Sequence, residues 1–167
     1  MEIRVNRIVS SLEIGLDDVR MIGIKGIGGG GKTTLATAVF EHISIWFEGA
    51  SFVENVREAS KSSLFGLKEL QKQLLSDVLN VQGINVKNLF DGKNQLRRAM
   101  STRKVLVVLD DVDCIDQLEA LVGERTWFKQ GSRIIITTRD EQVFAKQQVN
   151  YIHDPVCIWE RDSNSRL

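Results

Sequence analysis

The chain has 167 residues, 43% of them apolar and 26% charged, which is the composition of one globular domain with a sizeable core. Its 22 basic and 22 acidic residues cancel, so we expect no nucleic-acid partner of the kind that a strong basic field attracts. The two cysteines and two histidines do not have the spacing of a zinc site. Two cysteine thiols, expected to be reduced, favour a cytoplasmic location. No apolar run is long enough to span a membrane, so we expect no membrane partner.

The first elements surround a glycine-rich segment. Residues 1–20 predict a weak lead-in helix that ends near Gly15, and the apolar run 21–25 predicts a buried strand. Residues 26–33 then read G-I-G-G-G-G-K-T, a full match to the phosphate-binding pattern G-x-x-x-x-G-K-[ST]. A helix is expected from Thr34 to about residue 45, because its apolar residues recur at helical spacing.

A glycine-rich turn between a strand and a helix is the setting in which this pattern binds a nucleotide. The backbone N–H groups of the turn and the positive end of the helix dipole converge on one point, which attracts a β-phosphate. We expect Lys32 to reach the β- and γ-phosphates and the Thr33 hydroxyl to hold Mg²⁺. The alternative is a flexible glycine linker, but a linker requires neither the Lys-Thr-Thr sequence nor a flanking strand.

The middle of the chain predicts a strand over 50–54 and a polar loop over 61–66. A helix is expected over 67–80, where leucines and valines form one apolar stripe. Another helix is expected from Asp91 or Gly92 to about residue 102. Three arginines lie towards its C-terminal end, where cations suit the helix dipole: Arg97, Arg98 and Arg103.

The last part of the chain again alternates strands with helices. Strands are expected over 104–109 and 133–138 and from residue 151, and helices over 116–122 and 141–147. Strands that are apolar throughout predict a parallel sheet that is covered on both faces. With the phosphate-binding pattern, this predicts an α/β fold, the three-layer sandwich of a P-loop NTPase with about five parallel strands.

Two aspartates directly follow the predicted strand 104–109. Ligands of parallel sheets lie beyond the carboxyl ends of the strands, where the Gly26–Thr33 segment also lies. A carboxylate at the tip of a buried strand requires a partner, and for Asp110 we favour Mg²⁺ shared with the Thr33 hydroxyl. Asp111 is a candidate for orienting a water or acting as a base. The alternative for Asp110 is a cap on the next helix.

Arg139 follows the strand 133–138 and so lies at the same edge of the sheet. An arginine in this place is suited to contact a γ-phosphate and so to report its presence. The alternative is a surface arginine that pairs with Asp140 or Glu141.

Four segments, in this order, resemble the NB-ARC domain of the plant nucleotide-binding leucine-rich-repeat disease-resistance receptors. They are G-I-G-G-G-G-K-T-T-L-A (26–36), F-V-E-N-V-R-E (52–58), K-V-L-V-V-L-D-D-V-D (104–113) and G-S-R-I-I-I-T-T-R-D (131–140). The second segment and Asp113 are similar to the subgroup with a Toll/interleukin-receptor domain. We therefore expect a lead-in segment over 1–20, an incomplete NB-ARC subdomain over 21–153 and a divergent tail over 154–167.

The resemblance implies a molecular switch in plant defence signalling, which holds ADP at rest, exchanges it for ATP on activation and hydrolyses ATP slowly at most. Its expected partners are the nucleotide and other receptor domains or receptor chains. The nucleotide would contact Gly26, Gly28, Gly29, Gly30, Gly31, Lys32, Thr33, Thr34 and Arg139. Thr33 and Asp110 would hold Mg²⁺, and Asp111 would orient the attacking water.

Two other functions stay open at this point. A small P-loop phosphotransferase would need an arginine-rich lid, for which residues 97–103 are the candidate cluster. A truncated adaptor would bind no nucleotide and pair with full-length receptors. A GTPase ranks last, because the chain has no Asn-Lys-x-Asp segment for selecting the base.

Overall fold

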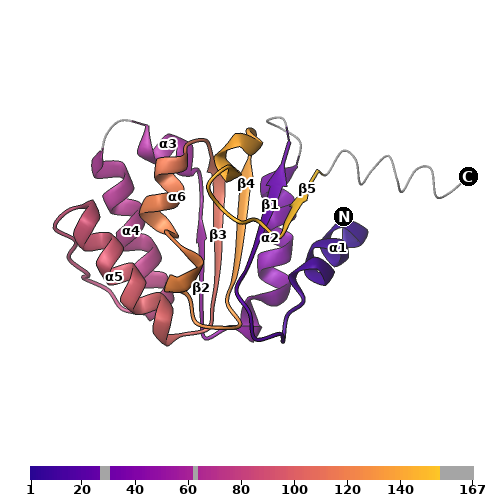
Figure 1. Ribbon diagram of the computed structural model, residues 1–167, viewed down its shortest axis with the longest axis horizontal. Helices are drawn as coiled ribbons and strands as arrows, with labels where there is room; N and C mark the ends of the chain where they lie inside the picture. Colours follow the sequence, from indigo (N-terminus) through magenta and orange to yellow (C-terminus); the bar gives the residue numbers. More distant parts are fainter. Residues whose placement is uncertain (27–30, 62–63, 155–167) are drawn as a thin grey trace, which may run out of the picture.

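The computed structural model describes residues 1–26, 31–61 and 64–154 (Figure 1). The helices are α1 (Glu2–Leu12), α2 (Lys32–Ile43), α3 (Val56–Ser60), α4 (Leu64–Leu79), α5 (Leu89–Thr102) and α6 (Ile115–Leu121). The strands are β1 (Arg20–Lys25), β2 (Gly49–Val53), β3 (Val105–Val112), β4 (Arg133–Thr138) and β5 (Tyr151–His153). Short 3-10 helices are η1 (Ser44–Trp46), η2 (Arg125–Trp127) and η3 (Glu141–Phe144).

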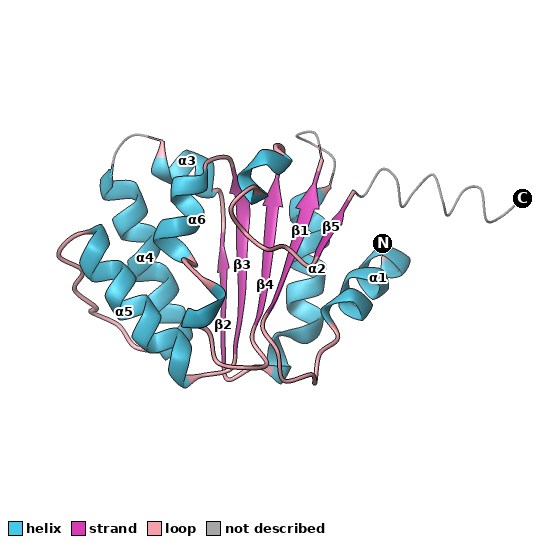
Figure 2. Ribbon diagram, in the orientation of Figure 1, coloured by secondary structure: helices cyan, strands magenta, loops and turns pink. Residues whose placement is uncertain are grey.

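The described strands form one parallel sheet in the order β2-β3-β4-β1-β5. Helices α1 and α2 cover one face of it, and α4, α5 and α6 cover the other (Figure 2). The α/β fold with a sheet of about five parallel strands between two helical layers is therefore confirmed. None of the helices in the described part of the chain combines the length and the apolar character that a bilayer crossing requires.

The central strands contribute side chains to two separate apolar cores, because successive side chains point to opposite faces of a sheet. In β3, Val105, Val107 and Leu109 pack with α4, α5 and α6. Leu106 and Val108, which alternate with them, pack with α1 and α2. Both faces are buried, which is why these strands read as continuous apolar runs in the sequence.

The predicted loop over 61–66 is wrong, because α4 already begins at Leu64 and a further helix, α3, precedes it. This region offers few periodic apolar residues, and Gly66 has a low helix propensity. In the structure Gly66 faces the Ala59 carbonyl of α3, where an added Cβ would clash with the backbone. Close packing of the two helices thus outweighs the weak local preference.

Other boundaries differ for reasons that are local. Helix α5 begins at Leu89 rather than at Asp91 or Gly92, because the Asn88 side chain caps it by accepting from the Asp91 N–H at 2.8 Å. The lead-in helix ends at Leu12 rather than near Gly15, since its C-terminal flank adopts a left-handed conformation. The helix expected over 141–147 is only the short η3.

Strand β3 does not stop before its two aspartates but continues to Val112. The pairing with β4 shifts register between Leu109 and Val112. Asp111 lies in this irregular stretch with a φ of 61°, a left-handed conformation that is uncommon outside glycine. Such an irregularity re-aims a side chain, here at the edge of the sheet where ligands of this fold bind.

A buried arginine fastens the segment between α1 and β1 to the sheet. Arg133, the first residue of β4, has no exposed side-chain surface. Its guanidinium donates to the Asp18 carboxylate at 2.9 Å and to backbone carbonyls of Leu12, Glu13, Leu16, Asp18 and Ser132 at 2.6–3.3 Å. Burial lowers the pKa of Arg133, while Asp18 opposes that shift.

Gly49 lies where β2 meets the last turn of α4. A Cβ added to it would come within 2.6 Å of the Val78 carbonyl oxygen, which belongs to a helix backbone and has little freedom to move. We expect Gly49→Ala to lower the free energy of unfolding by about 1–3 kcal/mol, the usual cost of overpacking. Urea denaturation followed by circular dichroism measures this, and an unchanged midpoint would contradict it.

Candidate functional site

The carboxyl ends of β1, β3 and β4 lie at one edge of the sheet, at the top of Figure 1. A pocket of about 320 Å³ opens there. A larger pocket of about 510 Å³ lies between the first turns of α4 and α5, but none of the residues predicted to bind nucleotide lines it. The pocket at the strand ends is lined by Gly31, Lys32, Thr33, Thr34, Asn55, Asp111, Thr137 and Arg139.

Lys32 combines charge with burial. It is the first residue of α2 and only 6% exposed. Gly31 before it has φ 79° and ψ 13°, a left-handed conformation in which glycine carries no steric cost. Burial lowers the pKa of Lys32 and the Arg139 charge lowers it further, while Asp111 and Asp110 oppose both. An anion bound at the start of α2 would offset the desolvation of this ammonium group.

Asp110 lies beneath the pocket, 2% exposed, and its carboxylate accepts two threonine hydroxyls. The Thr33 hydroxyl lies 2.9 Å from Oδ1 and 3.2 Å from Oδ2, and the Thr137 hydroxyl donates to Oδ1 at 2.8 Å. The N-cap of the following helix is Cys114, so the capping alternative for Asp110 is wrong. A hydroxyl and a carboxylate side by side are the hard oxygen ligands that Mg²⁺ prefers.

Thr137 is a site residue whose part in this network sequence reasoning did not find. It bridges the two aspartates, because its hydroxyl oxygen accepts the Asp111 N–H at 2.8 Å while it donates to Asp110. These two hydrogen bonds can form because β4, which carries Thr137, lies between β1 and β3 in the sheet. The order of strands is a non-local property that no local pattern in the sequence carries.

Asp111 forms ion pairs with two arginines. Arg57 Nε lies 3.2 Å from Oδ2, and Arg139 Nε lies 3.7 Å from Oδ1. The hydrogen bond to Asp111 raises the pKa of Arg57. Arg139 is half-exposed and forms its ion pair with Asp111, whereas Glu141 pairs with Lys25 at 3.0 Å. The alternative, in which Arg139 pairs with Asp140 or Glu141, is therefore not found among the ion pairs of the described residues.

Two residues that follow β2, Asn55 and Arg57, were not predicted to belong to the site. Asn55 lines the pocket and has a φ of 50°, and Arg57 follows on α3. Both belong to the segment F-V-E-N-V-R-E, and a search beyond the strand predicted over 50–54 would have found them. In contrast, Arg97 and Arg98 lie exposed on α5 and do not line the pocket.

A match to the NB-ARC domain family covers residues 1–164. The chain belongs to the NB-ARC family. This confirms the resemblance drawn from the four sequence segments. In this NB-ARC chain, one pocket is lined by six of the residues expected to serve the nucleotide, and the Thr33 hydroxyl among them donates to Asp110. The six are Gly31, Lys32, Thr33, Thr34, Asp111 and Arg139. Gly26 is tied to β4 by its N–H bond to the Thr138 carbonyl, and Gly28, Gly29 and Gly30 lie outside the described residues.

Several curated plant proteins are similar to this NB-ARC chain. Disease resistance protein RPV1 of Vitis rotundifolia is 42% identical over 151 residues, which is 90% of this chain and 11% of that protein. TMV resistance protein N of Nicotiana glutinosa is 42% identical over 158 residues, covering 90% and 13%. Disease resistance-like protein CSA1 of Arabidopsis thaliana is 34% identical over 164 residues, covering 98% and 14%. The NB-ARC chain thus spans between a tenth and a seventh of the length of these relatives.

A solved structure, that of the Aeropyrum pernix ORC2 protein in ADPNP and ADP complexes, is also similar. The match covers 92% of this NB-ARC chain and 44% of the ORC2 chain, with 16% sequence identity and a TM-score of 0.46. At this TM-score the similarity says nothing of function.

Proposed function

We propose that this NB-ARC chain is the ADP- or ATP-binding switch module of a plant immune receptor that acts in cytoplasmic defence signalling. The observation that carries the proposal is the buried Lys32 ammonium group, which lies beside left-handed Gly31 at the start of α2. Family membership and the names of the plant relatives support the role in defence. Its proposed partners are the nucleotide and other receptor domains or chains.

The pocket residues fit the parts of a nucleotide diphosphate in charge and kind. Lys32 and the first backbone amides of α2 suit the phosphates, with Thr34 at the pocket wall. Thr33 and Asp110 fit Mg²⁺, which usually takes one or two carboxylates and completes its shell with phosphate and water oxygens. When bound there, the ion would neutralise phosphate charge.

Arg139 is the proposed sensor of the third phosphate. Its side chain is 50% exposed, lines the pocket and lies 3.7 Å from Asp111, which makes this ion pair weak and exchangeable. A γ-phosphate therefore offers Arg139 a more highly charged partner than the one it has. Asp111, which lines the same pocket, is proposed to orient the attacking water of a hydrolysis that is slow at most.

Thermal unfolding of the purified chain tests the proposal. A ligand present at 100 times its Kd adds about 2.7 kcal/mol of stability, or a rise in Tm of about 5–10 °C for a domain of this size. We expect that rise with millimolar ADP or ATP and a smaller one with GTP at the same concentration. Mass spectrometry of the untreated protein would detect ADP retained from the cell. No rise with either adenine nucleotide would overturn the proposal.

Asp110→Ala separates the proposed metal site from the phosphate site. We expect the variant to keep ADP affinity within about threefold, because Lys32 and the α2 amides remain. Mg²⁺-dependent ATP hydrolysis should fall about 100-fold, the usual loss when a group that fixes charge stabilisation is removed. Single-turnover phosphate release with and without Mg²⁺ measures this. Asp116→Ala, an aspartate of α6 outside the pocket, is the control and should hydrolyse ATP at the parent rate.

A further inference from the structure

The Asp111 carboxylate is held by two arginines that come from different parts of the fold. Arg57, on α3, approaches Oδ2 through Nε at 3.2 Å with hydrogen-bond geometry. Arg139, just beyond β4, approaches Oδ1 at 3.7 Å, which is an ion pair without a hydrogen bond. The side chain of Asp111 is only 15% exposed, so it depends on these partners more than a surface carboxylate would.

The two arginines differ in how firmly the structure holds them. Arg57 is 28% exposed and lies on a helix whose first residue, Val56, is fully buried in the core. A second carboxylate, that of Glu58, lies 3.8 Å from Arg57 Nη2. Arg139 is 50% exposed and lies outside regular structure between β4 and η3. Arg57 is thus the fixed partner of Asp111, and Arg139 is the exchangeable one.

Resting on the proposed nucleotide function, we infer that Arg57 is a positioning residue that sets the preference of the site between ATP and ADP. Arg57 holds Asp111 when Arg139 turns to the γ-phosphate of ATP. Without Arg57, that turn would leave a poorly hydrated carboxylate close to a polyphosphate, and two like charges in such a place repel strongly. ADP has no third phosphate to draw Arg139 away, so its binding does not involve the exchange.

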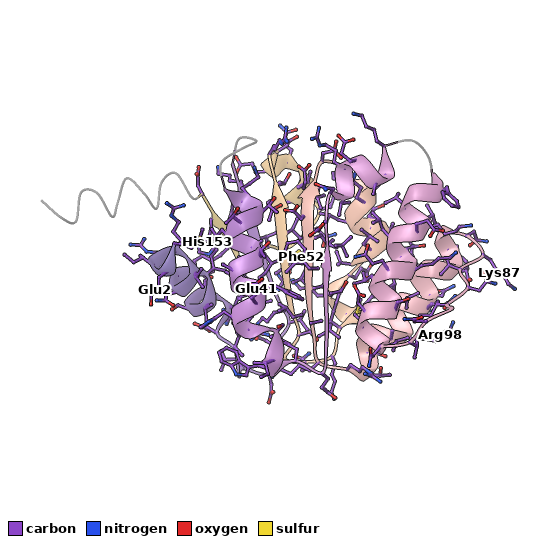
Figure 3. All side chains as sticks on the ribbon, turned by 180° about the vertical axis from the view of Figure 1, so that it is seen from behind. Glu2, Glu41, Phe52, Lys87, Arg98 and His153 are labelled. Carbon is purple, nitrogen blue, oxygen red and sulfur yellow. The ribbon has the colours of Figure 1, made fainter. Side chains whose placement is uncertain are left out.

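The test measures the Kd of ADP and of a slowly hydrolysed ATP analogue by calorimetry for the whole chain. We expect Arg57→Ala to weaken binding of the ATP analogue about fivefold, within the range of coupling between neighbouring charges, and to leave the Kd of ADP unchanged. Arg57→Lys should bring the ratio of the two Kd values part of the way back to that of the parent chain. The matched control is Arg98→Ala, which removes an exposed arginine from α5, below the edge of the sheet that carries the pocket (Figure 3).

A double-mutant cycle with Asp111→Asn separates positioning from a structural role. In the Asp111→Asn background there is no carboxylate charge to hold, so adding Arg57→Ala should leave the ratio of the two Kd values unchanged. An equal loss of ADP and ATP-analogue affinity, or the same change in both backgrounds, would overturn the inference. So would an unchanged ratio in the single variant. Failure of the parent chain to bind either nucleotide would instead overturn the proposed function itself.

Discussion

Lys32→Ala is expected to abolish nucleotide binding at concentrations where the parent chain is saturated. The Lys32 ammonium group is 6% exposed, and its pKa is lowered chiefly by burial, so keeping a cation at this point costs the folded chain free energy. Removing one partner of a buried charge pair usually costs 2–5 kcal/mol or more of binding free energy. That corresponds to a loss of roughly 30- to several thousand-fold in affinity for ADP and ATP alike.

The measurement is the rise in Tm with added nucleotide, which in the variant should be about a third of the parent value or less. The ligand-free Tm of the variant is measured alongside, so that a loss of binding is distinguished from a loss of folded protein. Lys25→Ala is the charge-matched control, since Lys25 pairs with Glu141 and does not line the pocket. It should keep the parent response. A Lys32 variant that still responds fully to ADP would show that the phosphates bind elsewhere.

Arg133→Met is expected to destabilise the fold more than Gly49→Ala does. Methionine fills a similar volume but removes donors from five backbone carbonyls and the Asp18 carboxylate. Buried acceptors left without donors cost about 1–3 kcal/mol each when water does not reach them. Because some of these carbonyls would regain water, we expect a net loss of about 3–5 kcal/mol.

Such a loss is a large part of the roughly 5–15 kcal/mol that usually separates folded from unfolded chains. It should lower Tm by about 6–20 °C for a domain of this size. Differential scanning calorimetry measures the change. Arg97→Met is the control, because Arg97 is exposed on α5 and its guanidinium donates to the nearby Asn94 side chain, so its effect should stay within about 0.5 kcal/mol. Equal Tm values for the two variants would contradict the anchoring role of Arg133.

The layered fold could be predicted because each central strand is an uninterrupted apolar run. Residues 105–109 and 134–136 pack against helices on both faces of the sheet, so each of these positions requires an apolar side chain. The start of α4 could not be predicted in the same way, because Gly66 and the polar residues 61–63 favour a loop, whereas in the structure Gly66 packs closely against Ala59 of α3. Local preference and tertiary packing disagree at that point, and packing decides.

The site was predictable in part for a similar reason. Lys32 and Thr33 were predicted from the glycine-rich phosphate-binding pattern, and Asp110 from its place after an apolar run, since parallel strands end at one edge of a sheet. The position of Arg57 depends instead on α3 returning across the end of β3, and that of Thr137 depends on the order of the strands. Both are consequences of chain topology, which the spacing of residues along the sequence does not encode.

Strand β4 begins at Arg133 and ends at Thr138, and it is paired with β1 along one edge and with β3 along the other. A strand bonded on both sides is stiff along its axis, and this one extends about 20 Å. At its first residue, the Arg133 side chain binds the segment between α1 and β1, and near its last residue the Thr137 hydroxyl binds Asp110. One strand therefore carries both the anchor of the lead-in segment and a side chain of the candidate site.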